Sequence, residues 1–348
     1  MSRSPPPAGT KRRTRLRRIA LVLGLALAAV AATVAELAYR FVHLRHFTLQ
    51  PSMWAEDADL LYKLNPEHAA TPGSFRGAAP RAHKTELRIV CLGGSTTYGH
   101  DLPLNDTWPV LLAGELRARG VAAEVINAGT PGYGSRQQLL RYRRDLAALD
   151  ADLVLINEGW NRTGALSDKD GWVPFGIARQ EDGIATHTLF VIAKVSMIVR
   201  QALTTLYVRA RSEGPPRAPL DPHHEQFIDD ITSLTREITQ RGQRPVLIVY
   251  PSLLHADMLP AERDLYAQRL WEKRSYHPDM LVELERKHRA LRAIAAATPC
   301  AAIDVQARFA GDRGEARLRW FLDQMHLSAP GNRKMAAIIA DALLPLIK

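Results

Sequence analysis

Five short apolar runs alternate with longer segments of helical periodicity after residue 86. The apolar runs occupy residues 87–92, 121–127, 153–157, 245–250 and 301–305. The periodic segments between them occupy residues 107–119, 136–149, 227–238, 279–297 and 331–346. Strands that lack polar alternation are typical of sheets buried on both faces. The pattern therefore predicts an α/β fold in which a five-stranded parallel sheet lies between two layers of helices.

Polar and glycine-rich residues follow the first three of these predicted strands. Ser95 comes after the first strand, residues 129–134 after the second and residues 158–161 after the third. In an open parallel sheet, functional sites form at the carboxyl ends of the strands. We therefore expect these three loops to converge at one edge of the sheet.

The longest apolar run lies near the N-terminus, at residues 19–39, and Glu36 is its single charged residue. A helix of this length spans about 30 Å at ~1.5 Å per residue, which is enough to cross a bilayer. Basic residues precede it, so residues 1–18 are predicted to be a cytoplasmic tail of a single-pass inner-membrane protein. The rest of the chain is then periplasmic or extracellular. Small residues at 33–35 leave a cleavable signal peptide as the alternative to the anchor, and it would export the same domain.

The remaining sequence predicts a stem, a large domain and an insertion. Residues 40–84 contain several prolines and no sustained periodicity, so they are expected to form extended segments and turns packed on the domain. Residues 85–348 are predicted to be one domain with an insertion at about 162–224. Residues 188–207 of the insertion resemble an amphipathic helix that packs on the domain, covers the site as a lid or touches the membrane. Residues 1–15 are expected to be disordered.

Net charge and metal-ligand spacing exclude some classes of function. The chain carries a net charge of +10, but seven of its 46 basic residues lie in residues 1–18, which leaves 39 basic against 36 acidic residues elsewhere. Nucleic-acid binding is therefore not expected. His223 and His224 lack a second pair of metal ligands, so we predict neither a metal nor a cofactor. Cys91 and Cys300 lie beside apolar runs and are expected to be free thiols.

Three residues could together make a hydroxyl attack an ester. Ser95 lies on a turn flanked by glycines, and Asp323 precedes His326 by three positions. A serine hydroxyl becomes a useful nucleophile when an imidazole accepts its proton and a carboxylate orients that imidazole. The sequence therefore predicts a serine hydrolase.

Four blocks in the same order resemble the SGNH, or GDSL-like, hydrolase family. They are residues 93–99, 127–133, 159–161 and 323–332, and they span most of the chain after residue 86. The resemblance implies a three-layer α/β/α fold with a flavodoxin-like sheet, no metal, and action on esters. The first block departs from the family, because Gly94 stands where the family has the aspartate of its name. That aspartate is not a member of the catalytic triad.

The resemblance also implies the role of each site residue. Ser95 would attack the acyl carbon, His326 would take and return the proton, and Asp323 would orient the imidazole. The backbone N–H groups of Ser95 and Gly132 and the side chain of Asn161 would form the oxyanion hole.

Other interpretations of these residues stay open. Ser95 could cap a helix, and Asp323 with His326 could be a surface pair. The glycine of the second loop is ambiguous, since residues 129 and 134 are glycines too. Four further residues near the site could serve the substrate or only the fold: His100, Tyr133, Trp160 and His255.

The predicted function is hydrolysis of a short acyl ester, most plausibly acetyl, on a carbohydrate of the cell envelope or the exterior. The partners would be this acylated substrate and the membrane, through residues 19–39. A lipase or lysophospholipase acting on lipid, an acyltransferase using the same triad, and a non-catalytic scaffold of a polysaccharide-modification complex are the alternatives. The complete set of Ser95, Asp323, His326 and Asn161 argues against the scaffold.

Overall fold

The computed structural model describes residues 8–39, 53–161, 223–272 and 280–347, with a few positions between 184 and 202. The chain divides into two units. One comprises residues 1–50 with 182–213, and the other residues 51–181 with 214–348. Most of the insertion, including most of the predicted helix at 188–207, lies outside the described residues.

The second unit is built on the predicted five-stranded parallel sheet. Its strands are β3 (Leu87–Gly93), β4 (Ala123–Gly129), β5 (Leu153–Asn157), β6 (Arg244–Val249) and β7 (Ala301–Asp304). They lie in the order β4-β3-β5-β6-β7, which is the doubly wound order of flavodoxin-like folds. Gly93 at the end of β3 pairs with both Gly129 and Asn157. The three loops that follow these strands therefore start level with one another at one edge.

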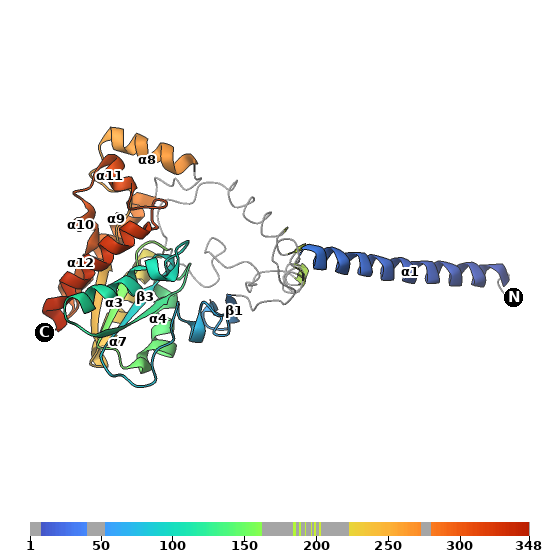
Figure 1. Cartoon of the computed structure of the whole chain (residues 1–348), viewed down its shortest axis with the longest axis horizontal. Coiled ribbons are helices and arrows are strands. Elements are labelled where there is room, and N and C mark those ends of the chain that lie inside the picture. The colour runs from blue at the N-terminus through green and yellow to red at the C-terminus, as the bar shows by residue number, and fades with distance from the viewer. Residues whose placement is uncertain are drawn as a thin grey trace. The chain divides into compact units, whose positions relative to one another are not determined.

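Alternate side chains of β3 point to two separate apolar cores. Ile89 and Cys91 lie in one core with helices α3 (Trp108–Ala118) and α12 (Ala329–Ile347). Val90 and Leu92 lie in the other with α4 (Ser135–Arg141), α7 (His224–Gln240) and α9 (Met280–Ala297). This alternation confirms the predicted arrangement of helices on both faces of the sheet (Figure 1).

Both cysteines of the chain are unpaired, as expected. Cys91 is fully buried in β3, and burial raises the pKa of its thiol well above the ordinary value.

Several element boundaries differ from the predictions. Strand β4 begins two residues later than expected, because the Val121 amide donates to the carbonyl of Leu116 and so ends α3. Helix α4 ends at Arg141, and a π turn and a 3-10 turn continue to Leu149. Three helices were not predicted: α8 (Pro260–Glu272), α10 (Val305–Phe309) and α11 (Gly314–Leu318).

The extended segments of the stem include a two-stranded antiparallel hairpin, which was not predicted as such. It pairs β1 (Trp54–Asp57) with β2 (Leu61–Leu64). Leu60 and Tyr62 are buried against Tyr133 of the loop after β4. The hairpin therefore packs on one of the three loops at the site edge.

The first unit contains α1 (Ala8–Tyr39). Its portion Arg17–Tyr39 has a mean hydropathy of 2.2. Among the helices that the structure describes, this one is long and apolar enough to cross a membrane. Length and composition fit both an anchor and a signal sequence. Because α1 begins at Ala8, the expectation of disorder is wrong for residues 8–15, where one alanine and four basic residues favour helix. Glu36 accepts hydrogen bonds from Ser196 Oγ at 3.0 Å and from the Ile198 amide at 3.2 Å.

Candidate active site

Ser95 stands at the carboxyl end of β3, where the chain turns into the short helix α2 (Ser95–Tyr98). Gly94 occupies the N-cap position of α2, so the serine side chain does not cap this helix. The Ser95 Oγ instead lies 2.9 Å from His326 Nε2. A serine on a turn after a central strand is thus brought against an imidazole 231 residues further along the chain.

Asp323 holds the same imidazole from its other side. Its Oδ2 lies 2.7 Å from His326 Nδ1, while its Oδ1 accepts the backbone amides of Met325 at 2.8 Å and His326 at 2.6 Å. Burial alone would raise the pKa of Asp323, but these hydrogen bonds and the neighbouring imidazole outweigh burial and lower it. The carboxylate is therefore ionised at neutral pH and favours the tautomer with a proton on Nδ1.

His100 lies beside this arrangement. Its ring centroid is 5.3 Å from that of His326, and its own Nε2 is 3.5 Å from Asp101. Burial lowers the pKa of His100 in spite of Asp101. His100 therefore contacts the imidazole that faces Ser95.

The glycines of the second loop have different structural tasks. A Cβ on Gly129 would lie 2.3 Å from the backbone nitrogen of Tyr98, so this position needs glycine for the packing of α2 on β4. Gly132 has φ +83°, a left-handed conformation that favours glycine. Gly134 has φ −97° and precedes α4. Gly132 is thus the glycine that shapes the turn itself.

Asn161 reaches back from the loop after β5 to the serine turn. Its Nδ2 donates to the carbonyl of Tyr133 at 2.9 Å. A Cβ on Gly94 would lie 2.4 Å from this Nδ2, so a side chain at residue 94 would require the Asn161 amide to move. Gly94, which stands where the family has an aspartate, leaves room for the amide in its present position.

Lys287 supports the same loop from α9. Its side chain is 0% exposed, and its Nζ donates to the Asn161 carbonyl at 2.7 Å. Sequence reasoning missed this residue. The buried face of this helix follows helical spacing and consists of residues 284, 287, 288 and 291. A lysine at a core position of a predicted helix was therefore the signal that could have identified Lys287.

Tyr62 of the stem supports the second loop and was also missed. Its hydroxyl donates to the Pro131 carbonyl at 2.9 Å, and the Tyr133 hydroxyl donates to the Tyr62 carbonyl at 2.5 Å. Burial raises the pKa of Tyr133, which keeps its hydroxyl protonated as a donor. Tyr133 therefore packs between the stem and the loop, and this structural role is enough to explain a tyrosine at this position.

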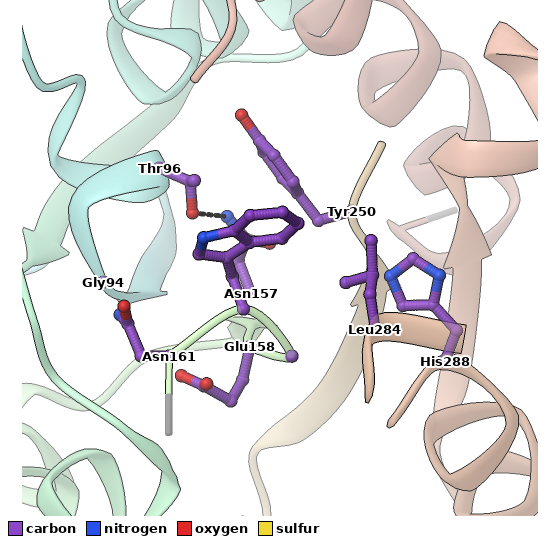
Figure 2. Close-up of a pocket in the computed structure, with 10 residues that line it drawn as sticks. Gly94, Thr96, Asn157, Glu158, Asn161, Tyr250, Leu284 and His288 are labelled. Atoms are coloured by element: carbon purple, nitrogen blue, oxygen red, sulfur yellow. Dashed lines mark hydrogen bonds between the residues drawn. The ribbon is translucent and has the colours of Figure 1, made fainter. Parts of the chain in front are cut away.

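A pocket of about 270 Å³, open solvent included, lies beside the serine turn. Figure 2 shows Gly94 and Asn161 on one side of it and Leu284 and His288 of α9 on the other. Its lining also includes Trp160 of the third loop. The full lining is Gly94, Thr96, Asn157, Glu158, Gly159, Trp160, Asn161, Tyr250, Leu284 and His288.

His255 does not line this pocket. Burial lowers its pKa to about 4, and Arg317 and Arg313 add to the effect.

The sequence model of the GDSL-like lipase/acylhydrolase family matches residues 91–334, which is most of the chain and includes Ser95, Gly132, Asn161, Asp323 and His326. The chain belongs to this family. This GDSL-like acylhydrolase is therefore a serine ester hydrolase, and its sheet order and site geometry agree with the fold that the resemblance implied.

Solved structures that resemble the GDSL-like acylhydrolase are distant in sequence. A lipase/acylhydrolase from Enterococcus faecalis is 17% identical, with 74% of this chain and 95% of that chain covered and a TM-score of 0.44. An acetylxylan esterase from Geobacillus stearothermophilus is 17% identical, with coverages of 75% and 95% and a TM-score of 0.46. No significant match was found among curated proteins.

Proposed function

We propose that this protein is an exported, membrane-anchored esterase that removes a short acyl group, namely acetyl, from a carbohydrate of the cell envelope or the exterior. The observation that carries the proposal is the continuous chain of short contacts from Asp323 through His326 to Ser95. Basic residues before an apolar helix support the anchored orientation.

The proposed reaction passes through an acyl-enzyme. Ser95 Oγ attacks the acyl carbon while His326 Nε2 takes its proton, and the same imidazole then returns that proton to the departing alcohol. Water repeats the sequence on the acyl-enzyme, which releases the carboxylic acid and restores Ser95. Asp323 stabilises the imidazolium that forms in each half of the reaction.

The oxyanion of each tetrahedral intermediate would meet three donors. These are the backbone N–H groups of Ser95 and Gly132 and the side-chain amide of Asn161. An amide carries two protons, so one N–H of Asn161 can stay on the Tyr133 carbonyl while the second serves the oxyanion. Lys287, which holds the Asn161 carbonyl, would be a positioning residue.

Hydrolysis of p-nitrophenyl esters from acetate to palmitate by the full-length protein in detergent tests the proposal. Activity confined to short chains and lost in Ser95→Ala and His326→Ala is expected. A long-chain optimum would favour the lipase. The acyltransferase would be favoured if an added alcohol speeds turnover and is itself acylated. Absence of both activity and phosphonate labelling of Ser95 would favour the scaffold.

Substitution of Asn161 by alanine is expected to lower kcat about 10²-fold to 10³-fold, because one preorganised oxyanion donor is lost. KM should change little, since the donor acts on the charge that develops in the transition state. Steady-state kinetics with p-nitrophenyl acetate measure both quantities. Equal kcat values for Asn161→Ala and the wild type would remove Asn161 from the proposed oxyanion hole.

Substitution of Lys287 by methionine is expected to lower kcat about tenfold with little change in KM. Methionine fills much the same space but leaves the backbone carbonyl of Asn161 without its donor. The side-chain amide of Asn161 is then held less firmly. Lys287→Arg should recover part of the loss. A role confined to folding would instead lower the melting temperature and leave kcat of the folded protein unchanged.

A further inference from the structure

His288 presents an unused hydrogen-bonding side chain to the pocket. It lies on α9 beside Leu284, and Figure 2 shows both at the wall opposite Gly94 and Asn161. The side chain is 0% exposed, yet within the described part of the chain neither ring nitrogen has a hydrogen-bond partner. A buried polar group without a partner costs stability, so such a group at a pocket wall points to a ligand.

The imidazole is neutral at neutral pH. Burial lowers the pKa of His288 to about 4, and Arg292 adds to the effect while Asp304 opposes it. A neutral imidazole carries one N–H donor and one acceptor nitrogen. The ring therefore matches a group that can both accept and donate a hydrogen bond.

Asn157 offers a second unused acceptor to the same pocket. Its Nδ2 donates to Thr96 Oγ1 at 3.2 Å and to Thr97 Oγ1 at 2.9 Å. The residue is 2% exposed, and its Oδ1 has no partner among the described residues. Both groups are uncharged hydrogen-bonding groups of one cavity.

The remaining lining disfavours an anionic ligand. The lining includes no lysine or arginine, and it includes the carboxylate of Glu158. Trp160 and Leu284 supply apolar surface beside the two polar groups. The chemistry that fits is a neutral hydroxyl on a small, partly apolar framework.

We propose that this pocket binds a hydroxyl group of the ester substrate through His288 and Asn157. The inference rests on the proposed esterase function and adds a substrate feature to it. The hydroxyl belongs either to the acyl group or to the alcohol that leaves. Each source has the same hydrogen-bonding chemistry at the pocket wall.

Two pairs of substrates separate these sources. The first pair is p-nitrophenyl β-hydroxybutyrate and p-nitrophenyl butyrate, which differ by one hydroxyl in the acyl group. The second pair is a mono-acetylated methyl glucoside and cyclohexylmethyl acetate. Both carry the same acetyl group, but only the glucoside has hydroxyls on its alcohol part. The measured quantity is the ratio of kcat/KM for the hydroxylated ester to that for the plain ester, which cancels general effects of a substitution.

His288→Leu is expected to lower this ratio about tenfold for one of the two pairs, because one hydrogen bond to a substrate hydroxyl is lost. His288→Gln should restore only part of the ratio and leave it about threefold below wild type, since an amide donates and accepts but places its atoms differently from an imidazole. If the leucine variant does not fold, this reduction of about threefold in the glutamine variant is the test. Arg289→Leu is the matched control, on the next residue of α9 with an exposed side chain, and should leave both ratios unchanged.

The outcomes distinguish this inference from the proposed function. A ratio that is reduced for the first pair places the bound hydroxyl in the acyl group. A ratio that is reduced for the second pair places it in the alcohol. Ratios that stay within about twofold of wild type for both pairs in folded His288 variants would overturn the inference and leave the esterase intact. Failure of the wild type to hydrolyse any of the four esters would overturn the proposed function and this inference with it.

Discussion

Replacement of Ser95 by alanine is expected to lower kcat for ester hydrolysis by about 10⁴-fold or more, since no other group can form the acyl-enzyme. The Ser95 Oγ is the atom that faces His326 Nε2 at 2.9 Å. A methyl group in its place removes the nucleophile and leaves the imidazole without the proton that it would accept. The measurement is kcat with p-nitrophenyl acetate, together with labelling by an active-site-directed phosphonate, which should be abolished.

His326→Ala should cost about as much as Ser95→Ala, and the double variant little more than either. This strong non-additivity is expected when two residues act as one unit. Ser135→Ala is a matched control, because Ser135 likewise begins a helix directly after a strand loop but donates its hydroxyl to Asp230. Its activity should remain within about threefold of wild type. Additive losses for Ser95 and His326, or continued labelling of Ser95→Ala, would contradict the proposed mechanism.

Asp323→Asn is expected to lower kcat about 10³-fold to 10⁴-fold while the fold is retained. The two carboxylate oxygens accept from three N–H groups, two on the backbone and one on the imidazole. An asparagine can direct its oxygen either to the two backbone N–H groups or to the imidazole N–H, but not to both. Its NH₂ group then faces the donors that remain. The imidazole loses either its orientation or the tautomer that leaves Nε2 free to accept the serine proton.

The comparison for this variant is Asp106→Asn, which removes a carboxylate from an exposed ion pair with Arg333. Its kcat should be nearly unchanged, because exposed ion pairs contribute little. Thermal unfolding of both variants checks that folded proteins are compared. If Asp323→Asn kept more than a tenth of wild-type kcat, the carboxylate would not be the orienter that the geometry indicates.

The sheet could be predicted closely because its strands are continuous apolar runs that are buried on both faces. Strand β5 has the bounds that were predicted, residues 153–157. The hairpin of β1 and β2 could not be recognised, since four-residue strands between prolines carry too little pattern. Helix α8 was missed because many of its side chains are exposed, so its apolar positions form no long stripe.

The three groups of the proposed triad could be selected from the sequence because each lies in a short block with its own spacing, and the structure brings them into contact. Lys287 and His288 could not be assigned in this way. They are adjacent residues of an ordinary helical segment, and only the packing of α9 against the third loop brings one to Asn161 and the other to the pocket. The oxyanion donors remain predictions that kinetic measurements must test.

The contact between Ser95 and His326 joins positions 231 residues apart. A ribosome makes the chain from the N-terminus, so Ser95 emerges long before Asp323 and His326 have been synthesised. Under the proposed mechanism, a nascent chain or a product truncated before residue 323 has the serine turn and all three loops, yet no base to activate the hydroxyl. The order of synthesis therefore keeps the enzyme inactive toward esters until residue 326 has been added.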